Sequence, residues 1–335
     1  MEQTTLDERP ELFVEVVSLI EKSFKYNKDN AYEVDFYPLM KKENHHNNHI
    51  LIKDNKVVAH IGYLERKILV KDKEFSAYFI GGIAVDEKHR GKGLFKELLN
   101  NTLEIYQDMT TFFLMWSDKA DLYENFSFYQ CGSVFQLGEE VFNEENNLSF
   151  KKEDSTSLST TEIKDLTELY NSSYKNIISP KRDSQTFREL LNVISSDLYI
   201  KRDDQGNIEH YLFMNKGFDL DGVIHEYSFL NNSKLMSDFK RFKLWSPTNT
   251  YGSNTTFFLG LFKVGAHSLF KEMISTIFDQ ELSIIKIDKN IDLEFRGENF
   301  SVSQSDFIEM VFGPGKADEF EDFQTSIFIS GLESI

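Results

Sequence analysis

Hydrophobic and polar positions divide the first part of the chain into helical and strand-like segments. Leu12, Val16 and Ile20 recur at helical spacing after Pro10, a residue that favours the first turn of a helix. The run 75–85 is apolar on both faces, which is typical of a central strand. The expected helices cover 11–24, 35–41, 94–106 and a short segment ending at 125. The expected strands cover 49–53, 57–70, 75–85, 111–116 and a final hairpin over 128–142.

The second part of the chain repeats the order helix, helix, three strands, helix. A polar stretch over 143–161 precedes this repeat and is typical of a linker. The repeated order predicts a degenerate second copy of the first fold, followed by a C-terminal segment with a helix over 267–278. We therefore expect an α/β (α+β) protein of tandem folds with mixed, mostly antiparallel central sheets. The expected units are a first domain (1–145), a linker (146–160), a degenerate second domain (161–264) and a C-terminal segment (265–335).

Charge narrows the classes of partner. Lys plus Arg number 37 and Asp plus Glu number 55, so the net charge is −18. A strongly acidic chain repels phosphate backbones, so we expect no nucleic-acid partner, and a cationic amine is a more natural guest. The alternative is that the charge only keeps the chain in solution. The single cysteine, Cys131, excludes an intrachain disulfide and a multi-cysteine metal site.

The N-terminal residues are polar and acidic, which argues against a signal peptide. No apolar run approaches the roughly 20 residues of a membrane span. We therefore expect a cytoplasmic location and no membrane partner. The histidines His45, His46 and His49 lie in an Asn-rich polar stretch, so we expect no metal there. The oligomeric state is not predicted.

The most informative motif is a strand, a basic glycine loop and a helix start over 82–95. Lys88, Arg90 and Lys92 surround two glycines in an otherwise acidic chain. Glycine allows an anion to approach the backbone closely, and a helix N-terminus presents free N–H groups to it. The motif therefore predicts a pyrophosphate cradle. A P-loop is excluded because Asp86 stands where its first glycine would be, and a dinucleotide fingerprint is excluded because no third glycine follows Gly93.

The loop Lys88-His89-Arg90-Gly91-Lys92-Gly93 resembles the Arg/Gln-x-x-Gly-x-Gly/Ala signature of the GCN5-related N-acetyltransferase (GNAT) superfamily. Lys88 replaces the Arg or Gln of the first position and keeps the positive charge of an arginine. The resemblance implies tandem GNAT folds and acetyl-CoA as cosubstrate, with pyrophosphate on the loop and pantetheine along the preceding strand. The implied cofactor-binding residues are Ile83, Ala84, Val85, Lys88, His89, Arg90, Gly91, Lys92, Gly93 and Leu94.

A second family signature is similar to Leu122-Tyr123-Glu124-Asn125-Phe126-Ser127-Phe128, in which Ser127 replaces the usual glycine. It implies that Tyr123 protonates the departing CoA thiolate. The alternative is that this tyrosine only packs in the core.

The order of the three parts also resembles the Eis-like acetyltransferases. That resemblance implies that the chain end returns to the first domain and that the α-carboxylate of Ile335 is the catalytic base. Alternatively, Ile327, Ile329 and Ile335 complete a core strand, and Glu65 or Glu74 could be the base. If the terminal carboxylate is the base, loss of 332–335 is expected to reduce kcat and to spare stability.

The resemblance therefore implies an N-acetyltransferase that acts by direct attack of a primary amine. The expected acceptor is a polyamine, an aminoglycoside-like amine or a lysine side chain. The alternative is a non-catalytic acyl-CoA-binding sensor or interaction module.

Overall fold

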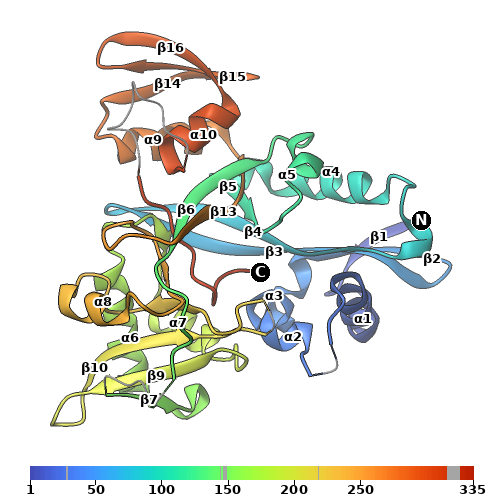
Figure 1. Cartoon of the computed structure of the whole chain (residues 1–335). Coiled ribbons are helices and arrows are strands. Elements are labelled where there is room, and N and C mark those ends of the chain that lie inside the picture. The colour runs from blue at the N-terminus through green and yellow to red at the C-terminus, as the bar shows by residue number, and fades with distance from the viewer. Residues whose placement is uncertain (28, 144, 146–148, 218, 315–324) are drawn as a thin grey trace.

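Three β-sheets organise the protein, with helices packed against them (Figure 1). The computed structural model describes residues 1–27, 29–143, 145, 149–217, 219–314 and 325–335. The central sheet has nine strands in the order β1-β2-β3-β4-β5-β13-β6-β12, and β8 pairs with β3. Its strands pair antiparallel except for β4 and β5, which run parallel. The predicted class, α/β with a mixed and mostly antiparallel central sheet, is confirmed.

The strands of the central sheet come from both halves of the chain. They are β1 (Glu2–Thr5), β2 (Asn48–Lys53), β3 (Lys56–Val70), β4 (Lys73–Val85), β5 (Phe112–Met115), β6 (Tyr129–Gln136), β8 (Ser179–Pro180), β12 (Trp245–Ser246) and β13 (Thr255–Val264).

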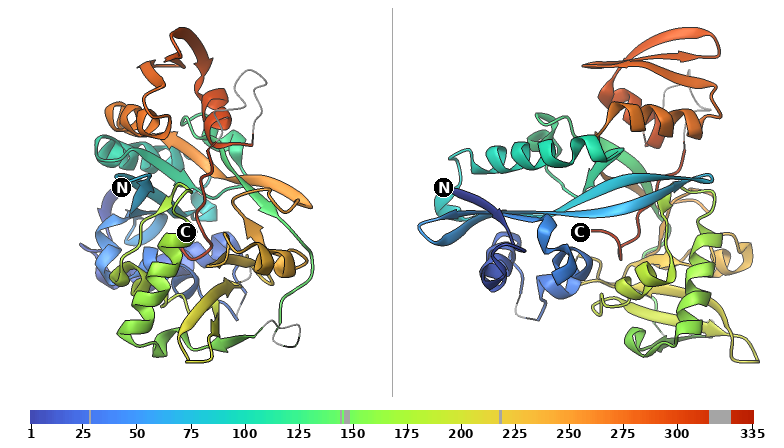
Figure 2. Two further views of the ribbon diagram at one scale, coloured as in Figure 1. Left: turned by 90° about the vertical axis from the view of Figure 1, so that its left-hand side faces the viewer. Right: turned by 180° about the vertical axis from the view of Figure 1, so that it is seen from behind.

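Helices cover the two faces of this sheet (Figures 1 and 2). On one face lie α1 (Phe13–Phe24), α2 (Tyr32–Asp35) and α3 (Tyr37–Met40); on the other lie α4 (Leu94–Tyr106) and α5 (Ala120–Glu124). Val16 and Ile20 of α1 are fully buried, as their helical spacing predicts. The single helix expected over 35–41 is instead two short helices, α2 and α3. Pro38 falls in the first turn of α3, because proline has no N–H for a continuing helix.

The hairpin predicted over 128–142 is wrong. Strand β6 occupies its first half, but β6 pairs with β12 and β13. Strand β13 lies between β5 and β6 and pairs antiparallel with both. Phe262 of β13 is fully buried and stacks on Phe112 of β5, with ring centroids 4.7 Å apart. A strand from the second half of the chain therefore completes the first sheet.

The second half of the chain also forms two smaller sheets. The four-stranded sheet has the order β11-β10-β9-β7, and the three-stranded sheet has the order β14-β15-β16. Their strands are β7 (Phe150–Glu153), β9 (Asp197–Arg202), β10 (Ile208–Met214), β11 (Ile224–Tyr227), β14 (Leu282–Ile287), β15 (Asn290–Phe295) and β16 (Glu298–Ser303). The accompanying helices are α6 (Thr160–Ser173), α7 (Ser184–Leu190), α8 (Ser233–Phe239), α9 (His267–Ile277) and α10 (Gln304–Phe312).

The expected domain boundaries do not coincide with the sheets everywhere. Strand β7 falls within the expected linker 146–160, of which residues 146–148 lie outside the described part of the chain. Strand β13 falls within the expected second domain but pairs in the first sheet. The division into 1–145, 146–160, 161–264 and 265–335 remains a prediction.

The C-terminal segment runs back to the middle of the molecule. Ile327 forms an isolated bridge with Ile178, and the chain then passes between the central sheet and the four-stranded sheet (Figure 2). Ile327, Ile329 and Ile335 are all buried. Among the described helices, none has the length and apolar character needed to cross a membrane.

Candidate active site

A bulge in β4 shapes the centre of the site. His60 of β3 lies opposite Ala84, but Gly62 lies opposite Gly81, so β4 contains one extra residue between these pairs. Gly82 lies in this bulge with a φ of +62°, a conformation that favours glycine. The buried His60 ring contacts the Gly82 carbonyl oxygen through Nδ1 at 2.7 Å. Burial lowers the pKa of His60 to about 4, so the imidazole is neutral and supports the bulge without adding charge.

Strands β4 and β5 separate just before the bulge. Their last paired residues are Ile80 and Met115. A cavity of about 450 Å³ opens at this point and extends to β13 and the C-terminal turn. Ile83, Tyr123 and Ile335 all line it, although they lie far apart in the sequence.

Tyr123 projects into this cavity from the short helix α5. Its side chain is only 7% exposed and packs edge-on against Phe95 and Phe128. Burial raises the pKa of its hydroxyl to about 12, although a hydrogen bond with Ser117 acts in the opposite direction. The Tyr123 hydroxyl therefore keeps its proton at neutral pH and can donate it.

The chain end lies against the backbone of β4. A Cβ atom placed on Gly81 would be 2.6 Å from the terminal carbonyl carbon of Ile335 and 2.9 Å from its oxygen. Glycine is therefore the residue that lets the terminus approach so closely. The same geometry places the main-chain carbonyl of Ile335 beside the bulge, at the wall of the cavity.

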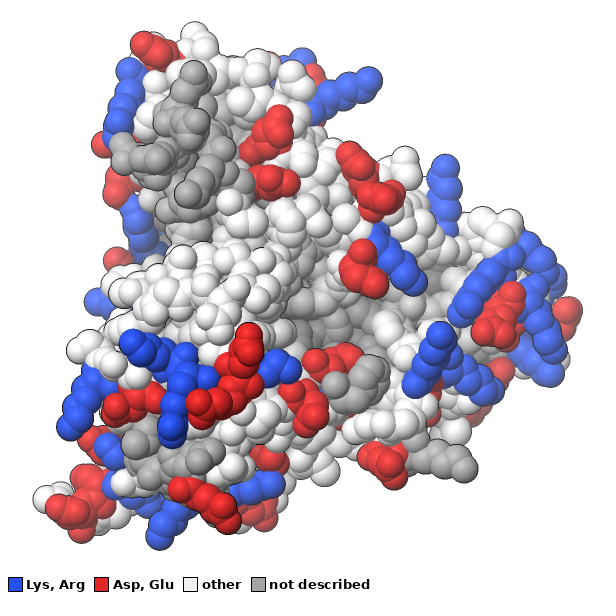
Figure 3. Space-filling model, viewed as in Figure 1, with Lys and Arg blue, Asp and Glu red and all other residues white. Residues whose placement is uncertain are grey.

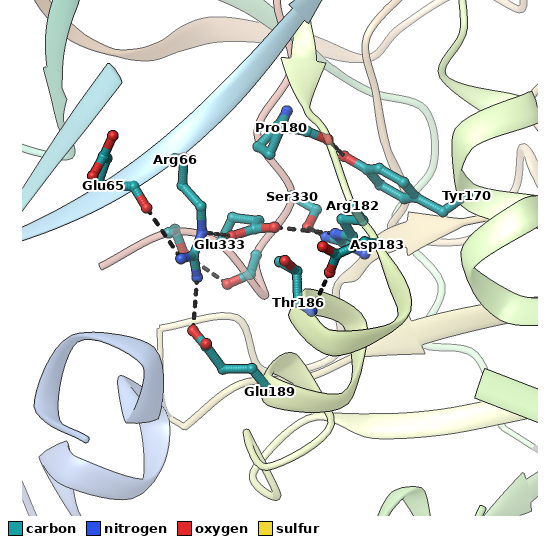
Figure 4. A network of polar contacts seen from close by, with 12 residues as sticks. Glu65, Arg66, Tyr170, Pro180, Arg182, Asp183, Thr186, Glu189, Ser330 and Glu333 are labelled. Atoms are coloured by element: carbon teal, nitrogen blue, oxygen red, sulfur yellow. Dashed lines mark hydrogen bonds and ion pairs between the residues drawn. The ribbon is translucent and has the colours of Figure 1, made fainter. Parts of the chain in front are cut away.

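Buried ion pairs hold the segment that precedes Ile335 (Figure 4). Glu333 accepts hydrogen bonds from Arg66 Nε of β3 at 2.6 Å and from Arg182 Nε at 3.0 Å. Arg182 also donates two hydrogen bonds of 2.7 Å to Glu226, and Arg66 reaches Glu189 of α7 at 3.2 Å. Burial alone would raise the pKa of Glu333, but the two guanidinium groups lower it overall. The carboxylate is therefore charged and fixed between two sheets.

Lys216 binds the same segment from another side. Its Nζ donates to the carbonyl oxygens of Gly331 at 2.7 Å and Ser334 at 2.5 Å, and lies 3.2 Å from the Ser334 hydroxyl. Burial lowers the pKa of Lys216 to about 7, while Asp35, Asp219 and Glu333 act against that shift.

The glycine loop lies at the far end of β4. Gly91 and Gly93 have φ angles of +73° and +81°, and no described atom lies within 4 Å of a Cβ built on either residue. Asp86 stabilises the loop by accepting from the Lys88 N–H and the His89 ring. Figure 3 shows Lys and Arg side chains gathered at this end of the molecule, where Figure 1 places the start of α4 and the turn between β2 and β3. The loop thus presents open backbone and positive charge, which suits an anion.

The structure separates the predicted site residues into two groups. Ile83, Tyr123 and Ile335 meet at the cavity. Ala84 and Val85 continue β4 away from it, and the six loop residues 88–93 lie beyond the end of that strand, followed by the buried Leu94 at the start of α4.

Other candidates do not reach the cavity. Glu65 lies beside Lys67 and Ser76, and Glu74 pairs with Lys181, so both carboxylates are half exposed at a different hollow. Within the described residues, no three His, Cys, Asp or Glu side chains come together as a metal site. The sequence analysis missed Lys216 and the partners of Glu333, because no local motif marks them.

The cavity wall is largely aromatic. The lining side chains carry two acidic groups, Asp118 and Asp219, and two basic groups, Lys119 and Lys216, so acidic and basic groups are equal in number. Among the described residues, the buried hydroxyl of Tyr32 has no hydrogen-bond partner, and neither has the buried indole N–H of Trp245. The aromatic lining residues are Phe24, Tyr26, Tyr32, Phe36, Trp116, Tyr123, Trp245, Phe257 and Phe258.

Comparison with known proteins identifies a family for the first part of the chain. Residues 9–131 match the family model described as an acetyltransferase (GNAT) domain. None of the curated protein sequences matches the chain significantly.

Solved structures resemble the whole chain in fold. A GCN5-related N-acetyltransferase from Kribbella flavida is 10% identical, with 100% of both chains covered and a TM-score of 0.61. A probable N-acyltransferase of unknown function from Enterococcus faecalis V583 is 10% identical, with 90% of this chain and 84% of that chain covered and a TM-score of 0.58. Eis1 from Mycobacterium abscessus is 8% identical, with 96% and 92% covered and a TM-score of 0.56. At such low identities the likeness shows a shared fold.

Proposed function

We propose that the chain is an acyltransferase that transfers an acetyl group from acetyl-CoA to a primary amine, because residues 9–131 match the model of a GNAT acetyltransferase domain. The observation that carries this proposal is the cavity where β4 and β5 separate. It brings a protonated tyrosine, Tyr123, and a carboxylate, that of Ile335, to the same space beside the β4 bulge. A proton donor for the departing thiolate and a proton acceptor for the attacking amine both assist acyl transfer to an amine.

The loop and β4 fit the cosubstrate. Positive φ at Gly91 and Gly93 turns open backbone outward, and Lys88, Arg90 and Lys92 supply charge for a pyrophosphate. Strand β4 leads from this loop to the cavity, and Ile83 lies at its bulge. A pantetheine arm that follows Val85, Ala84 and Ile83 would deliver the thioester to the cavity.

The proposed reaction is direct attack. The amine nitrogen forms a bond to the thioester carbonyl carbon, and the carbon–sulfur bond then breaks. Tyr123 gives its proton to the departing thiolate. In a chain that ends at Ile335, the terminal carboxylate accepts the proton that the amine nitrogen loses. The products are an N-acetylated amine and CoA, and proton exchange with solvent restores both groups.

The cavity lining supports one kind of amine over others. Its acidic and basic side chains are equal in number, so it offers a polycation little beyond the single terminal carboxylate. Aromatic rings favour an apolar body, and a ring face can also attract one ammonium group. Within the proposed class of primary amines, we therefore favour a monoamine with an apolar or aromatic body over an aminoglycoside.

A thiol-release assay with a panel of amines tests the proposal. The panel contains arylalkyl monoamines, polyamines, aminoglycosides and lysine peptides, and mass spectrometry identifies the acetylated product. We expect release that depends on both acetyl-CoA and an amine, with the highest kcat/KM for an apolar monoamine. Tight acetyl-CoA binding without thiol release for any amine would favour a non-catalytic sensor instead.

A further inference from the structure

The C-terminal turn is held by two separate sets of contacts. On one side, Glu333 is paired with Arg66 and Arg182. On the other side, Lys216, which is 3% exposed, binds the carbonyl oxygens of Gly331 and Ser334. The Lys216 contact is the one nearer to the terminus, because the Ser334 carbonyl belongs to the peptide bond that joins Ser334 to Ile335.

We propose that Lys216 is a positioning residue, which fixes the turn 330–334 so that Ile335 stays against Gly81 in the cavity wall. The turn itself is short: the N–H groups of Glu333 and Ser334 both donate to the Ser330 carbonyl. Such a turn leaves the Gly331 and Ser334 carbonyls without partners from a regular element. Lys216 donates to both, and the Ser334 hydroxyl also donates to the Gly331 carbonyl at 2.8 Å. The kinetic consequence drawn below rests on the proposed function.

The surroundings of Lys216 suit an ammonium group. Three oxygen atoms of the turn lie within 3.2 Å of Nζ, which matches the three donors of an ammonium better than a planar guanidinium. The Phe36 ring lies 4.4 Å from Nζ, so its face adds a cation–π contact. The carboxylates of Asp35, Asp219 and Glu333 attract the charge, and His225 next to it is neutral because burial lowers its pKa to about 3.

Burial of a lysine stabilises a fold poorly, since removing its charge from water is costly. An apolar side chain at this position would pack without that cost, but the Ser334 carbonyl would lose its Lys216 donor and the Gly331 carbonyl would keep only the Ser334 hydroxyl. The position therefore fits a residue that holds the turn, rather than one that only fills space.

Carboxypeptidase digestion of the folded 335-residue protein tests the anchoring directly. Mass spectrometry follows the loss of Ile335 from the wild type, Lys216→Met, Lys216→Gln and the control Lys271→Met. Lys271 also donates to a backbone carbonyl, that of Ile285, but lies outside the cavity lining. We expect Ile335 to be protected in the wild type and the control, and to be released about 10-fold faster or more in both Lys216 variants.

Lys216→Gln is neutral but keeps a polar group at this position. It therefore provides the test of anchoring if Lys216→Met does not fold. Protection of Ile335 equal to wild type in a folded Lys216 variant would overturn the proposal.

Kinetics separate this inference from the proposed function. If Lys216 acts through the terminus, Lys216→Met lowers kcat without changing the KM for acetyl-CoA, and it has no further effect in a protein that lacks Ile335. A large loss of kcat with full protection of Ile335 would contradict a positioning role. A third outcome is faster release of Ile335 with no loss of activity in either Lys216→Met or the protein that lacks Ile335. In that case Lys216 anchors the terminus, but the base role proposed for Ile335 is wrong.

Discussion

Among single residues, Tyr123 combines burial with access to the cavity, and burial keeps its hydroxyl protonated. Tyr123→Phe keeps the ring contacts with Phe95 and Phe128 but removes the proton. We expect kcat to fall by roughly 10²-fold or more, within the range of general acid catalysis, with little change in acetyl-CoA affinity. Since the pKa of Tyr123 is about 12, no decline in kcat from its ionisation is expected below about pH 10.

Steady-state kinetics and calorimetry check this prediction. Tyr129→Phe is the matched control, because Tyr129 lies on β6 outside the cavity lining. A Tyr123→Phe enzyme with unchanged kcat at saturating substrate would leave Tyr123 with a packing role only.

Lys216 should make stability depend on pH. Its pKa is about 7 in the folded protein, compared with about 10.4 in an unfolded chain. Between these values the unfolded chain binds more protons, so the free energy of unfolding should rise as pH increases from 7 to 10, by a few kcal/mol at most. Denaturant unfolding across this range measures the slope, and Lys216→Met should flatten it. Equal slopes in the two proteins would mean that Lys216 titrates normally.

How well a site residue could be predicted depends on how local its signal is. Tyr123 and the glycine loop belong to contiguous motifs, so their roles could be predicted from the sequence alone. Lys216 and the Gly331 carbonyl are 115 residues apart, and Arg66 and Glu333 are 267 apart. Such partners meet only through the tertiary fold, so neither periodicity nor spacing marks them.

At the level of elements, the loop before α4 depends on backbone conformation. Gly91→Asp introduces a side chain at a φ of +73° and a negative charge where a pyrophosphate is proposed to bind. We expect acetyl-CoA binding to be lost by calorimetry while the protein stays folded. Gly206→Asp is the control, because Gly206 lies in the β9–β10 turn with a φ of +89° and no described atom within 4 Å of a built Cβ. Equal affinity in the two variants would contradict the loop assignment.

Most elements could be predicted because each is amphipathic or apolar on its own. The helix α1 and strands β2, β3 and β4 fall where the pattern placed them, to within two residues. The pairing of β13 could not be predicted. Its sequence from Thr255 to Val264 is apolar enough for a strand, but nothing local indicates that its neighbours are β5 and β6. Strand order depends on long-range packing. Hydrophobic alternation along a strand indicates which face is buried, but it does not indicate the neighbouring strands.

For the whole molecule, the shared central sheet implies that its two halves depend on each other. A fragment of residues 1–145 lacks β13, so β5 and β6 would lose the strand between them and expose unpaired edges. We expect this fragment alone to aggregate or to unfold without a cooperative transition, and to recover when residues 146–335 are coexpressed. Copurification and circular dichroism check both points. A fragment 1–145 that folds alone and binds acetyl-CoA would contradict the dependence.

The structure changes the effect on stability that is expected when the last residues of the chain are removed. Deletion of 332–335 was expected from the sequence to spare stability, but it removes Glu333 and leaves Arg66 and Arg182 as buried charges without that partner. The cost should be about 3–5 kcal/mol. Deletion of Ile335 alone keeps Glu333 and moves the carboxylate to Ser334, away from Gly81.

We therefore expect the single deletion to lower kcat by roughly 10²-fold, as for loss of a general base, with nearly unchanged melting temperature and acetyl-CoA affinity. The four-residue deletion should lower both kcat and the melting temperature. Gly81→Ala provides an internal check, because its Cβ would meet the terminal carbonyl carbon of Ile335 at 2.6 Å. Its effect on kcat should shrink in the protein that lacks Ile335, since the two changes act on one contact. Full activity after removal of Ile335 would exclude the terminal carboxylate as the base and leave the buried terminus with a packing role.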